Sequence, residues 1–270
     1  MFRRNRRPAV MAISEAELVQ LTSDLDEMHH ATLPAMHAAA GQWAEDLRAG
    51  AADFGRARTS RRRFLVGGSA SLGALALASC SSATSNKSVT SPTPTDRPGD
   101  TQLTGDFAIA ALAASLENLA VGTYQAGLDA ATAGKLGTVP PAVATFAATA
   151  KAQHADHAAA WNSVLTNASR KPVTGVDLTV KNGVVDPAFA QVTDVTALAK
   201  LALGLENVAA ATYLNGIGAI ENNNALKIAA SIQPVEMQHA AILNFVLGQN
   251  PVPDSFAKTD GFRAPGDQIG

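Results

Sequence analysis

The sequence is poor in several residue types, and each shortage excludes a class of protein. Its 270 residues contain a single cysteine, Cys80, so no intrachain disulfide can form. Aromatic residues make up only 5% of the chain, and the formal net charge is −2. A nucleic-acid-binding protein needs a basic face, so this charge balance argues against one. The sequence has no run of 18 or more strongly apolar residues, the length that would indicate a membrane-spanning helix.

Alanine is the residue that the chain has in quantity. Hydrophobic residues make up 47% of the sequence, and alanine dominates them. Alanine is the strongest helix former, and its small side chain lets helices approach closely. A strand-rich composition is absent, and about 170 residues suffice for an independent core. We therefore expect an all-α fold.

Residues 60–80 have the order of a bacterial export signal. Arg61 and Arg62 precede two bulky apolar residues, and a mildly apolar run follows over residues 66–78. The run ends at Cys80 in Leu-Ala-Ser-Cys, which resembles a lipobox, the site of cysteine acylation and cleavage. The resemblance to a twin-arginine lipoprotein implies export by that machinery and a lipid anchor on the outer face of the cytoplasmic membrane. The alternative interpretation is a basic loop before a buried helix.

An extension of 59 residues precedes this signal. Residues 12–50 are expected to be helical, because apolar residues recur there at spacings of three and four. His30 and His37 would share a helix face, where a metal ion could bind, but Pro34 is expected to interrupt the helix. Cleavage before Cys80 would remove the extension, and without cleavage it would remain as a cytoplasmic helix.

The segments on either side of the expected main domain are polar. Residues 81–105 are rich in Ser, Thr, Pro, Asp and Gly, so they cannot bury enough apolar surface to order themselves. We interpret them as a flexible tether behind the acylated cysteine. Residues 106–248 are expected to form the main domain, and residues 249–270 a C-terminal tail.

An internal repeat indicates two related helical hairpins. Leu116-Glu117-Asn118 recurs as Leu205-Glu206-Asn207, and each is followed at the same distance by Thr-Tyr, which places Tyr124 and Tyr213. A histidine-bearing helix follows each of these helices, and apolar residues recur along all four at helical spacing. About 25 residues connect the second and third helices, and Asn182-Gly183 predicts a turn inside that connection. The pattern predicts a four-helix bundle with a long crossover.

Three glutamates and three histidines fall on the apolar stripes, facing the core at about one height. A buried glutamate is costly unless it is paired or bound to a cation. Of the four glutamates beyond Cys80, only Glu221 lies off the stripes, and all three histidines beyond Cys80 lie on them. The candidate metal ligands are Glu117, His154, His157, Glu206, Glu236 and His239.

With this pattern, residues 106–248 resemble the ferritin-like superfamily, whose di-metal proteins take one Glu from each of two helices and Glu-x-x-His from the other two. The resemblance implies an iron or manganese centre. It makes Glu117 and Glu206 the single glutamates, Glu236 and His239 one Glu-x-x-His pair, and His157 the histidine of the other. It also implies that Tyr124 and Tyr213 orient ligand carboxylates by hydrogen bonds.

His154 departs from the family pattern, which has a bridging glutamate at that position. Three carboxylates neutralise two divalent ions incompletely, and a histidine cannot bridge two metals as a carboxylate does. We therefore expect weaker binding of the second ion, or a mononuclear site. Zinc or copper would tolerate the additional imidazole better than magnesium.

Several functions remain open from the sequence. The first is a di-iron or di-manganese oxidoreductase acting on oxygen, peroxide or ferrous iron. The alternative is a non-catalytic binding or structural lipoprotein with a degenerate or mononuclear site. The six polar residues could also form a hydrogen-bonded core network without a metal. A storage cage ranks last, because a tethered chain is poorly placed to assemble a closed shell.

Overall fold

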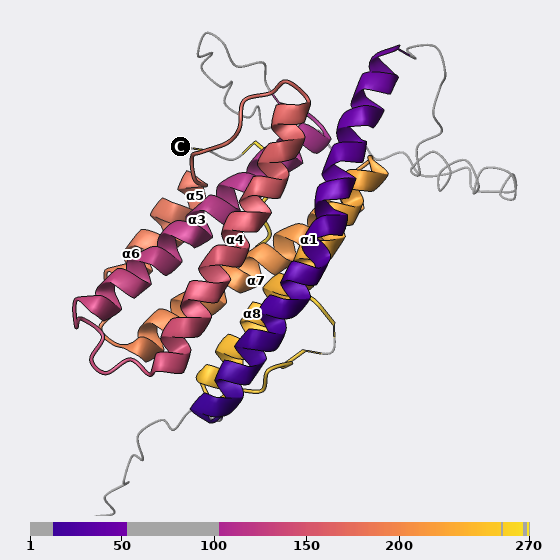
Figure 1. The fold of residues 1–270 in the computed structure, drawn as a ribbon. Coiled ribbons are helices and arrows are strands. Elements are labelled where there is room, and N and C mark those ends of the chain that lie inside the picture. Colours follow the sequence, from indigo (N-terminus) through magenta and orange to yellow (C-terminus); the bar gives the residue numbers. More distant parts are fainter. Residues whose placement is uncertain (1–12, 53–102, 255, 267–268, 270) are drawn as a thin grey trace, which may run out of the picture. The chain divides into compact units, whose positions relative to one another are not determined.

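The computed structural model describes residues 13–52, 103–254, 256–266 and 269, and these ranges are helical apart from turns, loops and one isolated bridge between Asp177 and Ile269. The elements in chain order are α1 (Glu15–Ala52), α3 (Asp106–Thr132), α4 (Pro141–Asn167), α5 (Leu178–Val180), η1 (Lys181–Val185), α6 (Asp186–Phe189), α7 (Val195–Ala219) and α8 (Asn223–Val246). The predicted all-α bundle is confirmed: α3 pairs with α4, α7 pairs with α8, and a long crossover joins the two hairpins (Figure 1).

Two predicted segments cannot be compared with the structure. The export signal at residues 60–80, with Arg61, Arg62 and Cys80, lies outside the described residues. So does the tether at residues 81–105, except for its last three residues.

Local chemistry sets where the bundle helices begin and end. Pro141 occupies the first turn of α4, where its missing N–H costs no hydrogen bond. The side chain of Asp194 caps α7 by accepting from the Ala197 N–H at 2.7 Å, and Asn222 caps α8 in the same way. After α3 the chain turns at Gly134, which has a positive φ of 70° that favours glycine. These signals produce two antiparallel hairpins with short connections.

The predicted turn at Asn182-Gly183 is wrong. These residues lie in the π-helix η1, between α5 and α6. The Asp177 carboxylate accepts from the Val180 N–H at 2.7 Å and caps the start of α5, which leads into η1. Val180 and Val185 are then buried in a cluster with leucines of α3 and α7. Burial of these apolar side chains outweighs the local preference of Asn-Gly for a tight turn.

The helices α3 and α7 are long and apolar enough, by length and composition, to cross a membrane. Their most apolar windows have mean hydropathies of 1.3 and 1.2. Each carries a buried glutamate, Glu117 or Glu206, whose side chain reaches the centre of the bundle. We therefore interpret both as bundle helices rather than membrane spans.

Within the N-terminal extension, Glu15–Ala52 forms one continuous helix, α1, which lies along α4 and α8 (Figure 1). Ser14 and Glu17 begin it with a reciprocal capping box, in which the Ser14 N–H donates to Glu17 and the Glu17 N–H donates to Ser14. The expected interruption at Pro34 is wrong, because the helix continues through this exposed proline. Buried residues on both sides of it, Leu25 before and Met36 after, hold α1 against the bundle. This packing outweighs the one missing backbone hydrogen bond.

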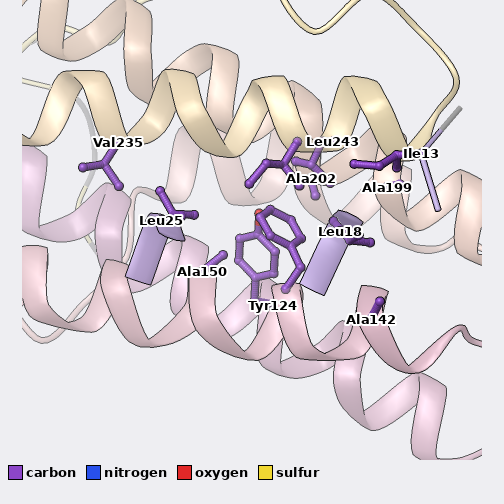
Figure 2. Packing of buried hydrophobic residues seen from close by; sticks show 12 residues of the cluster. Ile13, Leu18, Leu25, Tyr124, Ala142, Ala150, Ala199, Ala202, Val235 and Leu243 are labelled. Atoms are coloured by element: carbon purple, nitrogen blue, oxygen red, sulfur yellow. The ribbon is translucent and has the colours of Figure 1, made fainter. Parts of the chain in front are cut away.

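Residues of α1 are part of the main hydrophobic core. Figure 2 shows Leu18 and Leu25 of α1 close to Tyr124, with Leu243 of α8 in the same cluster. Leu18 is fully buried, and Leu25 is only 2% exposed. The described structure is thus a pair of helical hairpins with a fifth long helix covering the histidine-bearing side.

Candidate metal centre

The six side chains predicted as ligands lie together in the middle of the bundle. Each of the four bundle helices contributes at least one of them, and none is more than 2% exposed. They are Glu117 of α3, His154 and His157 of α4, Glu206 of α7, and Glu236 and His239 of α8. Helical spacing explains the arrangement, because positions three apart on α4 and on α8 point to the same side.

The six residues form two overlapping groups that could each hold a metal ion. One consists of Glu117, His154, His157 and Glu236; the other consists of His154, Glu206, Glu236 and His239. Within each group, one ligand atom per residue lies within 4.8 Å of all the others. His154 and Glu236 belong to both groups, so they stand at the middle of the cluster.

The imidazole of His154 is held between two carboxylates. Its Nδ1 lies 2.7 Å from Glu117 Oε2, and its Nε2 lies 3.3 Å from Glu206 Oε1. The ring thereby links α4 to both α3 and α7. With a proton on each nitrogen, it would donate to both carboxylates and supply a positive charge at this point.

The carboxylate of Glu236 faces imidazole nitrogens without forming hydrogen bonds to them. Its Oε1 lies 3.0 Å from His157 Nδ1, and its Oε2 lies 3.5 Å from His239 Nδ1. Among the described residues, neither oxygen has a hydrogen-bond partner of acceptable geometry, and His157 Nδ1 has none either. A buried carboxylate left in this state is costly, and a cation bound between these atoms would satisfy all of them. The donor set therefore fits a metal ion.

Two tyrosines orient the outer carboxylates, each across the bundle. The hydroxyl of Tyr124 donates to Glu206, and that of Tyr213 donates to Glu117 at 2.5 Å. Trp161 Nε1 donates in turn to the Tyr213 hydroxyl at 2.8 Å. Burial and the neighbouring carboxylates raise the pKa of both tyrosines well above the usual value, so both stay protonated and act as donors.

Opposite charges dominate the electrostatics of the cluster. Burial lowers the pKa of His157, but the negative charges of the nearby Glu117 and Glu236 carboxylates outweigh burial and raise it to about 9. Burial raises the pKa of Glu117, but the charge on His157 and the hydrogen bond to His154 Nδ1 bring it down to about 2. In the absence of a metal, these shifts favour ionised carboxylates next to protonated imidazoles.

The pKa values of the other charged groups of the cluster shift in the same way, up for the histidines and down for the glutamate. Burial opposes the charge on His154, but the carboxylates of Glu236 and Glu206 raise its pKa well above the usual value. Burial likewise opposes the charge on Glu206, but His154 and His239 hold its pKa well below the usual value. The same kind of balance raises the pKa of His239.

Sequence reasoning missed the contribution of α1 to this site. His29 is 2% exposed, and its ring centroid lies 5.1 Å from that of His157. Burial and the nearby His157 lower the pKa of His29 to about 4, so this ring is neutral. A signal was present, since His29 lies four residues after the buried Leu25 and seven before the buried Met36, on one helix stripe.

The contacts also correct one sequence interpretation on α1 and place two further side chains of α4 beside histidines. The metal pair that His30 and His37 could have formed on α1 is not seen, because both side chains are exposed and belong to none of the clusters of potential ligands among the described residues. Gln153, on the edge of its stripe, is 1% exposed and bonds to His239. Asp156 is partly exposed, but its carboxylate lies 3.3 Å from His29 Nε2.

An apolar cavity of about 50 Å³ is lined in part by Tyr124, the residue that donates to Glu206. Phe146 and Leu243 are part of its wall, and almost no polar surface lines it. A cavity of this kind stays dry and accepts small apolar molecules.

Together, the fold and the cluster define a four-helix bundle protein with a buried carboxylate–imidazole centre that could hold metal. Comparison with protein families agrees with this class: the family described as ferritin-like domain matches residues 105–249. The match covers more than half of the chain, and the chain belongs to this family. No curated protein and no solved structure matches the chain.

Proposed function

We propose that this chain is a metal-binding protein whose buried centre holds a divalent transition-metal ion. One observation carries the proposal: both oxygens of Glu236 are buried without hydrogen bonds while they face the Nδ1 atoms of His157 and His239. A combination of imidazole and carboxylate ligands suits iron, manganese, zinc and copper.

Charge balance favours one ion over two. One divalent ion with a protonated His154 would neutralise the three carboxylates, whereas two divalent ions would leave an excess positive charge in a buried site. In the one-ion state, His154 would stay bonded to Glu117 and Glu206, and Glu236 would hold the ion together with His157 or His239. This is the mononuclear site expected from the presence of His154 where the family pattern has a glutamate.

Metal analysis of the full chain, purified from an exporting bacterial host, tests the proposal. We expect about one ion per chain, and loss of most of it in Glu236→Gln. Glu221→Gln is the matched control, because Glu221 is the one glutamate beyond Cys80 that is not part of the cluster, and it is exposed. A wild-type chain that neither carries nor takes up iron, manganese, zinc or copper would overturn the proposal in favour of a metal-free core network.

A di-metal oxidoreductase acting on oxygen, peroxide or ferrous iron is the second candidate. Two observations support it: the ligand atoms form two groups of four, and an apolar cavity that a small oxidant could enter lies beside Tyr124. In such an enzyme the metals would supply the redox chemistry. Tyr124 and Tyr213 would hold two carboxylates in place, and the buried walls would exclude water.

Turnover assays separate the two candidates. The oxidoreductase is expected to carry two ions per chain and to consume peroxide or oxidise ferrous iron. It should lose this turnover in Glu206→Ala and keep it in Glu221→Ala. A wild-type chain with one ion and no turnover would leave the non-catalytic metal-binding protein.

We also propose that the domain is exported and held at the outer face of the membrane by a lipid on Cys80. The support is the sequence order of Arg61-Arg62, an apolar run and Cys80. A Cys80→Ala variant is expected to lose the lipid label and leave the membrane fraction. If it stays in that fraction, the anchor lies elsewhere.

A further inference from the structure

The helix α1 reaches the metal centre from outside the bundle. It lies along α4 and α8, the two helices that carry all three histidines of the cluster. Asp26 and His29 are one helical turn apart, so both face this side. Each makes a contact that leads to a different ligand histidine.

The first contact passes through Gln153. The Asp26 carboxylate lies 3.2 Å from Gln153 Nε2, and Gln153 Oε1 lies 2.8 Å from His239 Nε2. With its nitrogen donating to Asp26, the amide can only accept at its oxygen, so His239 must carry its proton on Nε2. The Nδ1 of His239 is thereby left to face Glu206 and Glu236.

The second contact is direct. The ring of His29 packs on that of His157, with 5.1 Å between centroids, and His29 Nε2 lies 3.3 Å from the Asp156 carboxylate. His29 is therefore fixed on one side by Asp156 while it limits the positions that the His157 ring can take. Groups that orient ligand histidines in this way affect metal affinity strongly.

Strong anchors hold α1 in place along its length. Leu18 and Leu25 are buried near its start. Near its end, Trp43 is 1% exposed and stacks on Phe107 of α3 at 5.7 Å between ring centroids. Asp46 accepts from the side-chain amide of Asn224, at the start of α8, at 3.0 Å. Because these contacts hold α1 on the bundle along its length, α1 is an integral part of the folded domain.

We propose that α1 is a fifth helix of the metal centre, with Asp26 and His29 as positioning residues for His239 and His157. The proposal rests on the proposed function for the nature of the centre. It also bears on export, because α1 precedes Cys80 in the chain. The bundle and α1 must work on the same side of the membrane, so a chain cut before Cys80 must keep α1 as a bound, separate peptide.

Variants of the full chain loaded with Co²⁺ test the positioning roles. We expect Asp26→Ala and His29→Ala to lower Co²⁺ affinity by about 10- to 100-fold and to change the visible spectrum of the bound ion. Asp26→Asn keeps an oxygen acceptor for Gln153 and should restore both readouts. The matched controls are Glu27→Ala and His37→Ala, which alter exposed side chains of the same types on α1.

Two results would overturn the proposal. One is a spectrum and an affinity for Co²⁺ that stay unchanged in the alanine variants while only the melting temperature falls, since that marks a merely structural helix. The other is measured in the metal-free chain and therefore applies even if the wild-type chain binds no metal, an outcome that would overturn the proposed function and not this proposal. The ring nitrogens of His157 and His239 are then followed by ¹⁵N NMR in the metal-free full chain. If Asp26→Ala and His29→Ala leave them unshifted, positioning by α1 is refuted independently.

A cut-chain experiment tests the retention of α1. A protease site is inserted between residues 53 and 60 of the full chain, and the folded protein is cleaved in solution. We expect the α1 fragment to co-elute with the bundle in size-exclusion chromatography and to separate only in denaturant. Leu18→Asp with Leu25→Asp should release it, and the exposed control Glu27→Ala should not. Release of the wild-type fragment on cleavage would show that α1 is not a permanent part of the centre.

Discussion

At the scale of single residues, His154 has the largest effect on the chemistry of the centre. Its ring stands between Glu117 and Glu206 and belongs to both groups of potential ligands. An imidazolium at this point does part of the work of a metal ion, because it places one positive charge between two carboxylates and joins three helices. A glutamate in its place would add negative charge and a bridging ligand.

Replacing this histidine tests that description. We expect His154→Glu to raise the number of divalent ions bound at saturation from one to two, measured by equilibrium dialysis with Mn²⁺ or Fe²⁺. The metal-free variant should be less stable than wild type, because four carboxylates would face only two imidazoles. His154→Gln, which adds no charge, is the control and should not gain a second ion. If His154→Glu still binds a single ion, the charge at residue 154 does not set the metal count.

The two tyrosines make a matched pair with unequal surroundings. Tyr213 both donates to Glu117 and accepts from Trp161, whereas Tyr124 is bonded only to Glu206. Tyr213→Phe leaves two buried polar groups without a partner, and each such group costs about 1–3 kcal/mol. We therefore expect urea denaturation to show a larger loss of unfolding free energy for Tyr213→Phe than for Tyr124→Phe. Equal losses would mean that the Trp161 bond contributes nothing measurable.

At the scale of elements, α1 shows how tertiary packing overrides a local helix breaker. Pro34 lies in the interior of α1 on its exposed side, and Pro234 lies in the interior of α8, also exposed. A proline inside a helix removes one backbone hydrogen bond and crowds the preceding turn. Both helices continue because their buried faces are held by the core on either side.

Removing the exposed proline of α1 should therefore stabilise the protein. We expect Pro34→Ala to raise the unfolding free energy by about 1–3 kcal/mol, since proline is about 3 kcal/mol less favourable than alanine inside a helix. Pro234→Ala in α8 is the comparison. If α1 were not docked on the bundle, Pro34→Ala would leave the main thermal transition where it is, and calorimetry distinguishes the two results.

At the scale of the whole molecule, the pKa shifts make the stability of the metal-free chain and its metal affinity change in opposite directions with pH. His157 has a folded pKa of about 9, against an ordinary value of 6.5. Its contribution to stability is complete below pH 6.5 and is lost as the pH rises through 9. A shift of this size corresponds to a contribution on the order of 3 kcal/mol. His29, with a lowered pKa of about 4, is neutral above pH 6.5 in both the folded and the unfolded chain, so it does not oppose the loss of stability with rising pH.

The metal-free chain should lose stability between pH 6.5 and 9, while its affinity for a divalent ion rises over the same range. The reason is shared, because an imidazole must release its proton before it can bind a metal. Urea denaturation of the metal-free chain and Zn²⁺ titration in buffers of different ionisation enthalpy measure the two effects. Proton release on binding is expected at pH 7. Affinity that is flat from pH 6.5 to 9 would contradict protonated histidines in the metal-free centre.

The helical bundle and the six candidate ligands follow from patterns in the sequence. Alanine-rich helical periodicity, the repeated Glu–Tyr spacing and the restriction of glutamate and histidine to the apolar stripes are local patterns. Because an α-helix has a fixed geometry, such patterns specify which side chains share a face before any packing is known. The six residues of the cluster, and Tyr124 and Tyr213, were therefore open to prediction.

The partners that these side chains meet depend on how the helices pack against one another. That Tyr124 bonds to Glu206 and Tyr213 to Glu117 depends on how the hairpins pack. That α1 continues through Pro34 and brings His29 to His157 depends on contacts between residues more than a hundred positions apart. Helical period fixes a direction around one helix axis, whereas the distance between two helices comes from the shape and burial of all their side chains.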